Sequence, residues 1–111
     1  SGKYECKLPW SAFRCTVATP TVILKREIAL ATRFLEDIRF MEDTIYWLNI
    51  ASKTNFIGLN INGCRVYVDD DTAAFNKKNL INGMKIIRRN FFSSNFFLWI
   101  THFFYCKIRG I

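Results

Sequence analysis

Three consecutive aspartates, Asp69, Asp70 and Asp71, are the densest group of potential metal ligands in the chain. Carboxylate oxygens suit hard divalent cations, and a catalytic site of this kind usually needs a third carboxylate from elsewhere in the fold. The three residues are therefore an alternative metal site. A solvated acidic turn between two strands is the favoured interpretation, so the sequence predicts neither a metal nor a cofactor.

The residues around these aspartates also resemble two enzyme motifs. Tyr67-Val68-Asp69-Asp70 has the form of the catalytic turn of reverse transcriptases, and Asp69-Asp70-Asp71 after an apolar run resembles the acidic motif of some glycosyltransferases. Neither a polymerase nor a nucleotide-sugar fold fits into 111 residues. The only histidine, His102, has no acid nearby in the sequence to orient it as a base. We therefore predict that the chain is not an enzyme.

Four cysteines leave the redox state open. Cys6 and Cys15 are close enough in sequence for a turn-linked disulfide, which would indicate an oxidising, extracellular compartment. Cys64 and Cys106 have no obvious partner. Neither a Cys-x-x-Cys spacing nor a Cys/His cluster supports a zinc site. Four buried thiols are the alternative interpretation.

Length and charge limit the class of protein. A chain of 111 residues is one domain at most, and its formal net charge is +7 with half of the residues apolar. This charge favours anionic partners, such as nucleic acid, sulfated glycans, acidic proteins or lipid headgroups. Basic and aromatic residues alternate over 85–92, but Phe91-Phe92 is predicted to be core, so nucleic acid is not the favoured partner.

The elements that would position these residues are strands for most of the chain. Residues 22–41 fit either one amphipathic helix or three short strands, with the helix slightly favoured by periodicity. Residues 45–50, 56–61, 64–68 and 84–88 are rich in β-prone side chains and bounded by turn residues. Residues 91–106 lack formal charge but are too few for a transmembrane helix, so buried strands are favoured there.

Within these strand candidates, the spacing of Tyr46-Trp47 and Asn60-Ile61-Asn62-Gly63 resembles the Tyr-Trp-Thr-Asp repeat of the low-density lipoprotein receptor family, the class B repeat. In the repeat such an aromatic pair lies within one strand, and a turn with the pattern of residues 60–63 closes the next strand. A fainter second copy has Asn82-Gly83 as its lead-in and Leu98-Trp99 as its motif. Residues 2–15 are predicted to form a short hairpin with Pro9 at its bend, and they resemble the last loop of an epidermal-growth-factor-like (EGF-like) module.

This resemblance implies an all-β fold. Residues 1–16 would be the EGF-like remnant, and residues 17–111 would form a partial β-propeller of about two antiparallel blades. The implied function is a non-catalytic module of an endocytic receptor at the cell surface, which binds extracellular proteins or lipoproteins and reaches the membrane only through the parent receptor. A small basic globular protein that binds an acidic partner, either nucleic acid or an anionic protein or glycan, is the alternative.

Overall fold

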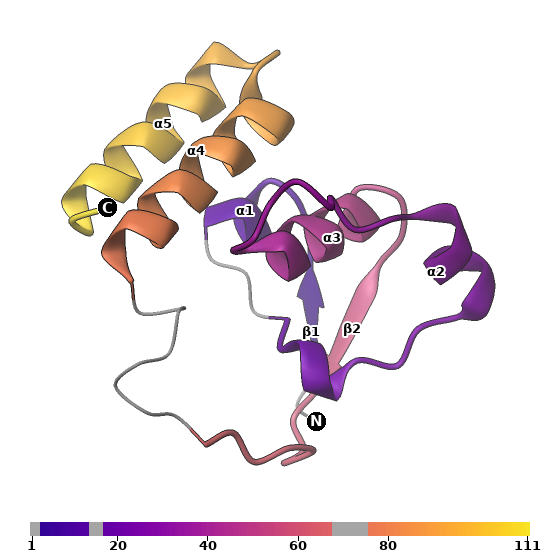
Figure 1. The fold of residues 1–111 in the computed structure, drawn as a ribbon. Coiled ribbons are helices and arrows are strands. Elements are labelled where there is room, and N and C mark those ends of the chain that lie inside the picture. The colour runs from indigo at the N-terminus through magenta and orange to yellow at the C-terminus, as the bar shows by residue number, and fades with distance from the viewer. Residues whose placement is uncertain (1–2, 14–16, 68–75) are drawn as a thin grey trace. The chain divides into compact units, whose positions relative to one another are not determined.

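The computed structural model describes residues 3–13, 17–67 and 76–111, and the chain separates into two compact units, residues 1–67 and 68–111 (Figure 1). In the first unit the elements are β1 (Lys3–Cys6), α1 (Trp10–Phe13), the 3-10 turn η1 (Thr19–Thr21), α2 (Arg26–Ala31), α3 (Glu42–Ala51) and β2 (Phe56–Leu59). The second unit contains α4 (Lys77–Phe92) and α5 (Phe96–Ile108).

The two strands of the first unit pair with each other over a long sequence distance. β1 runs antiparallel to β2, with Lys3 opposite Leu59 and Cys6 opposite Phe56. The short hairpin predicted for residues 2–15 is therefore wrong, because β1 takes its hydrogen-bonding partner from β2 and not from the residues that follow it.

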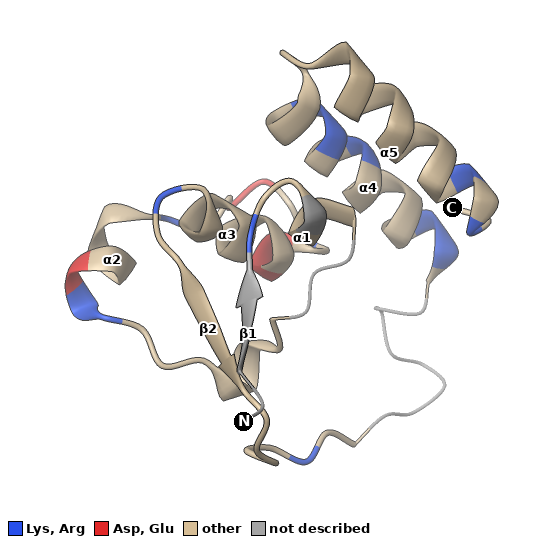
Figure 2. Cartoon of the chain, turned by 180° about the vertical axis from the view of Figure 1, so that it is seen from behind, with Lys and Arg blue, Asp and Glu red and all other residues tan. Residues whose placement is uncertain are grey.

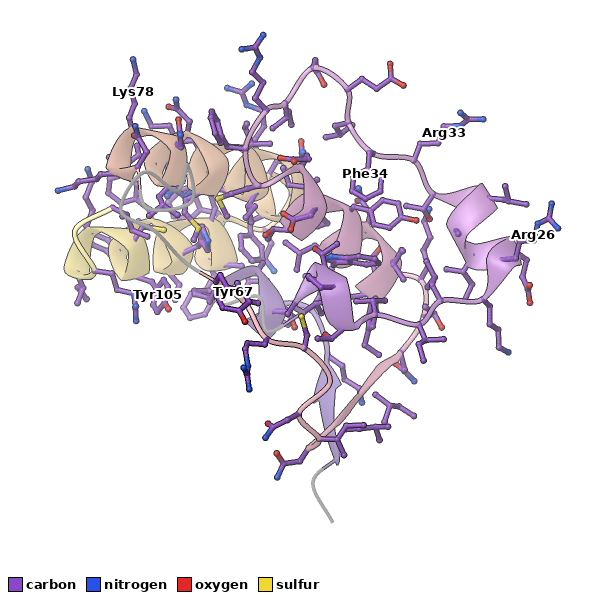
Figure 3. All side chains as sticks on the ribbon, turned by 60° about the horizontal axis from the view of Figure 1, so that its bottom comes forward. Arg26, Arg33, Phe34, Tyr67, Lys78 and Tyr105 are labelled. Atoms are coloured by element: carbon purple, nitrogen blue, oxygen red, sulfur yellow. The ribbon has the colours of Figure 1, made fainter. Side chains whose placement is uncertain are left out.

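The core of the first unit gathers on helix α3. Tyr46, Trp47 and Ile50 are buried there, and partly buried side chains from η1, α2 and β2 or their flanking residues pack against them: Val17, Val22, Leu24, Ile28 and Phe56. The Tyr46 ring stacks on Phe34 at a centroid distance of 4.0 Å, and Trp47 meets Phe56 edge to face at 5.9 Å. Phe34 is labelled in Figure 3. One helix thus gathers apolar side chains from much of the first unit.

The second unit is a hairpin of two helices that lie side by side (Figure 1). Each helix begins at an asparagine whose side-chain oxygen accepts backbone N–H groups that have no partner inside the helix. Asn76 accepts from Lys78 and Asn79, and Asn95 accepts from Leu98 at 3.1 Å. The turn between the helices, residues 93–95, is short, so α5 folds back along α4.

The predicted all-β propeller is wrong. Within 3–13, 17–67 and 76–111, strand structure is confined to β1 and β2, and the other regular elements are helical. Tyr46 and Trp47 lie in the middle of α3 and not in a blade strand. Glu42 and Asp43 lie in the first turn of α3, where the positive end of the helix dipole stabilises carboxylates. Ile45, Leu48 and neighbouring apolar side chains of the helix are buried. The burial of these apolar side chains on one helix outweighs the preference of Ile, Tyr and Trp for strands.

The second predicted repeat is also helical. Asn82-Gly83 lies inside α4 and forms no turn, and Leu98-Trp99 lies in α5. Asn60-Ile61-Asn62-Gly63 follows β2 without leading into another strand, and residues 62–67 have no regular structure. Gly63 does not adopt the positive φ that a tight Asn-Gly hairpin turn uses. The class B repeat and the β-propeller are therefore absent from these residues.

Two other predicted elements differ from the structure. The helix considered for residues 22–41 is reduced to the six residues of α2, because Thr32 already has extended backbone angles. The strands predicted at 84–88 and within 91–106 are parts of α4 and α5. The domain boundary predicted at residue 16 falls among residues 14–16, which lie outside the described residues.

Candidate functional site

The described part of the structure does not bring together the residues that the sequence predicts as metal ligands or as a disulfide. Asp69, Asp70 and Asp71 lie outside the described residues, as does Cys15, so neither the alternative metal site nor the Cys6–Cys15 disulfide can be placed. Cys64 and Cys106 are free thiols. Among the residues that the structure describes, no group of three His, Cys, Asp or Glu side chains could hold a metal ion.

One polar arrangement in the first unit was missed by the sequence patterns. Thr19 donates from Oγ1 to Asp43 Oδ2 at 2.8 Å, and the same hydroxyl accepts a hydrogen bond from Trp47 Nε1 at 3.1 Å. The other carboxylate oxygen of Asp43 accepts the backbone N–H of Thr44 at 2.7 Å. Asp43 is thus fixed at the start of α3 by both of its oxygens.

The residue before this acidic turn is strained. Met41 caps α3 in the left-handed region, with φ 62° and ψ 18°, a conformation that side chains other than glycine and asparagine adopt at an energetic cost. The arrangement aligns Glu42 and Asp43 at the helix start, where the partial positive charge of the helix favours carboxylates. Chemically, a carboxylate held in this way can accept a hydrogen bond or a proton. Its hydrogen bonds tie η1 to α3.

A second polar cluster lies between α4 and α5. Arg88 Nε donates to His102 Nδ1 at 3.3 Å, and the guanidinium carbon lies 5.4 Å and 5.1 Å from the ring centroids of Trp99 and Phe103. Because arginine only donates, Nδ1 of His102 must carry a lone pair, which places the ring proton on Nε2. The positive charge therefore meets an imidazole acceptor and two aromatic faces.

Cys106 completes this cluster, with Sγ 3.8 Å from His102 Nδ1. A cysteine beside a histidine is the pairing that nucleophilic catalysis uses. Here, however, the exposed fractions are 1% for Cys106 and 0% for His102, so a substrate has no path to either side chain. The cluster is therefore better explained as a buried contact that fixes the two helices against each other.

The charge of the chain is concentrated in this hairpin. Residues 76–111 hold seven of the sixteen Lys and Arg residues and none of the nine Asp and Glu residues, so the formal net charge of +7 belongs entirely to them. Figure 2 shows Lys and Arg along α4 and at the end of α5. The remaining 75 residues carry nine charges of each sign. Residues 1–75 are therefore neutral overall, and the cationic hairpin follows them in the sequence.

Three exposed cations of α4 form one line, which we call the basic stripe: Lys78, Lys85 and Arg89. Side chains seven and eleven positions apart lie on one face of an α-helix, because these spacings are close to two and three turns. Lys78 extends away from the helix in Figure 3. The stripe runs for about 16 Å at a rise of about 1.5 Å per residue.

Helix α5 repeats the same spacing with apolar residues, which we call the apolar stripe: Phe97, Phe104 and Ile108. Their exposed fractions are 74%, 56% and 87%, and Phe96 at the start of the helix is 75% exposed. The opposite side of α5 carries the buried His102 and Cys106. The outward side of α5 is therefore its more apolar side, the reverse of the usual arrangement in a surface helix.

Comparisons of the chain with protein-family models, with curated proteins and with solved structures found no match. In the described part of the chain, no helix combines the length and apolar character needed to cross a membrane.

The sequence contained a signal for both stripes. The spacings 78/85/89 and 97/104/108 are helical periods, and Asn76 and Asn95 are good helix-start residues. Two competing patterns obscure this signal: Asn82-Gly83 is typical of a turn before a strand, and the composition of the Phe-rich run favours buried strands. The Thr19 to Asp43 contact, in contrast, joins residues 24 positions apart and has no local signature.

Proposed function

We propose that this chain is a small basic binding protein whose α4–α5 hairpin binds an anionic partner. One observation carries the proposal: residues 76–111 contain seven cations and no acid, and three of those cations form an exposed stripe on α4. Cations this close repel each other, and an acidic partner relieves that repulsion. Binding of this kind needs no catalytic group.

The receptor-module function stays an untested prediction, and its structural basis has been removed. It relied on propeller blades, and the residues from which those blades were inferred lie in α3, α4, α5 and the irregular segment that follows β2. The alternative, a basic protein that binds an acidic partner, relied on net charge alone. The concentration of that charge on one hairpin supports this alternative.

A pair of charge-reversed variants of the full chain tests the proposal. K78E/K85E/R89E removes the basic stripe, and R33E/R39E/K53E makes the same change in net charge on exposed residues of the first unit. Arg33, for example, points away from the fold in Figure 3. Binding to heparin, single-stranded RNA and anionic lipid vesicles is measured for each protein at increasing NaCl concentrations.

We expect wild-type chain to bind at least one of these polyanions with an affinity that falls as salt is added, because salt screens exposed charges. The basic-stripe variant should bind at least about tenfold more weakly, and the control variant should remain within about threefold of wild type. Equal losses in both variants would show that net charge alone matters. The proposal fails in that case, and it fails if wild type binds none of the three polyanions.

A further inference from the structure

We infer that the anionic partner is a phospholipid surface, with α5 lying in the membrane interface and its apolar stripe inserted among the acyl chains. This inference rests on the proposed function and names the partner class of the same hairpin. It is carried by two features together: cations without any acid, and an outward helix face formed by Phe97, Phe104 and Ile108.

The dimensions of α5 suit a helix that lies in the interface. Its 13 residues extend about 20 Å, well short of the roughly 30 Å hydrocarbon core. The apolar stripe runs along most of that length, so a helix parallel to the surface would place all three side chains at the same depth. Interfacial helices bury such a face about 5–10 Å into the boundary between headgroups and acyl chains.

Cations flank the apolar stripe on the same helix. Lys107 is next to Ile108, and Arg109 follows at the helix end. Long basic side chains can lay their carbon stems along an apolar surface while the charged group reaches the phosphates. The basic stripe on α4 adds electrostatic attraction to the lipid phosphates, which acts over about the Debye length, about 8 Å at physiological salt.

Single-stranded nucleic acid fits the hairpin less well. Proteins that bind it place aromatic rings and cations along one groove, so that bases stack while phosphates are neutralised. Here the basic stripe is on α4, the exposed rings Phe97 and Phe104 are on α5, and the cations of α5 lie only at its C-terminal end. The most exposed member of the apolar stripe, Ile108 at 87%, also has no ring on which a base could stack.

A second copy of the chain fits less well for electrostatic reasons. Covering the apolar stripe with its equivalent on another copy would bring together two hairpins that each carry seven cations and no acid. Like charges at such an interface oppose association. An anionic lipid surface offers both hydrocarbon and negative charge, which a second copy of this hairpin does not.

The experiment distinguishes insertion of the apolar stripe into the membrane from electrostatic attraction alone. F97S/F104S/I108S removes the apolar stripe and keeps every charge, and I23S/L30S/I57S makes a matched change at exposed apolar residues of the first unit, which are 98%, 69% and 64% exposed. Circular dichroism is first used to check that each full-length variant keeps its helix content. Flotation is then measured with vesicles of phosphatidylcholine alone and with about one third phosphatidylserine, and heparin binding is measured in parallel.

We expect wild type to float with the phosphatidylserine vesicles and not with phosphatidylcholine alone. F97S/F104S/I108S should bind the anionic vesicles about tenfold or more weakly, because affinity scales with the apolar area buried, while its heparin binding is unchanged. The control I23S/L30S/I57S should bind both like wild type. This combination supports insertion of α5.

Three outcomes would overturn the inference. If F97S/F104S/I108S binds anionic vesicles as well as wild type does, the contact is electrostatic only. If wild type binds heparin or single-stranded RNA but no vesicle, the partner is not a membrane, although the proposed function stands. If sedimentation shows a dimer that F97S/F104S/I108S dissociates and no vesicle is bound, a second copy covers the stripe. Failure to bind any polyanion removes the proposed function as well.

Discussion

Arg88 and His102 form a buried hydrogen bond between the two helices of the cationic hairpin, with 3.3 Å between Arg88 Nε and His102 Nδ1. Arg88 is 8% exposed and His102 is fully buried. A buried guanidinium is costly to desolvate unless its N–H groups and its charge find partners. Here the imidazole acceptor and the faces of Trp99 and Phe103 supply them.

Replacing Arg88 should therefore destabilise the hairpin. R88M keeps most of the side-chain volume but removes the donor to His102 and the charge above the rings. We expect a loss of about 1–3 kcal/mol in the free energy of unfolding, because a buried polar atom is left without this partner. Urea unfolding followed by helical circular dichroism measures the change.

The matched control for this variant is R89M, at the neighbouring and exposed position. It should change the free energy of unfolding by no more than about 0.5 kcal/mol. Similar losses in R88M and R89M would contradict the assigned role of Arg88. A double-mutant cycle with H102L should give a coupling energy above about 0.5 kcal/mol between Arg88 and His102.

The side chain of Asn95 should set where α5 begins. Its Oδ1 accepts the N–H of Leu98 at 3.1 Å, and alanine cannot replace that acceptor. N95A should lower the free energy of unfolding by about 1 kcal/mol. N90A, at an exposed position inside α4, should be neutral or slightly stabilising, because alanine is the better helix former. A loss in N90A equal to that in N95A would argue against capping.

Parts of the second unit could be predicted from local sequence. Asn76 and Asn95 mark helix starts, and the spacing of Leu80, Met84, Ile87 and Phe91 is that of a helix face. The Asn-Gly pair at 82–83 gave the opposite indication, since it is among the strongest hairpin signals. In the structure Gly83 is a buried residue in the middle of α4, so tertiary packing overrode a local preference.

The first unit depends on contacts that no local pattern encodes. β1 pairs with β2 across about fifty residues, and Thr19 joins Asp43 and Trp47 from a different part of the chain. The aromatic pair Tyr46-Trp47 fits a strand as well as a helix by composition. Only the surrounding core, which Val17, Leu24 and other distant residues complete, decides in favour of the helix.

The Thr19 hydroxyl should contribute to the stability of the first unit. T19V is close in shape but removes both the acceptor for Trp47 Nε1 and the donor to Asp43. We expect a loss of about 1–3 kcal/mol in the free energy of unfolding. T19S keeps the hydroxyl and should lose less than half as much. The near-ultraviolet circular dichroism of Trp47 should change in T19V and not in T19S. Equal effects would mean that the methyl group matters more than the hydrogen bonds.

The backbone strain at Met41 predicts an order of stability among its variants. With φ at 62°, a β-branched residue is disfavoured, whereas asparagine adopts this conformation more readily. M41N should therefore be more stable than M41V by about 1 kcal/mol or more. Met41 is half-buried, so hydrophobicity alone would favour valine and reverse the order. Thermal unfolding of the two variants distinguishes these explanations: if M41V melts at the higher temperature, the left-handed conformation does not control how α3 begins.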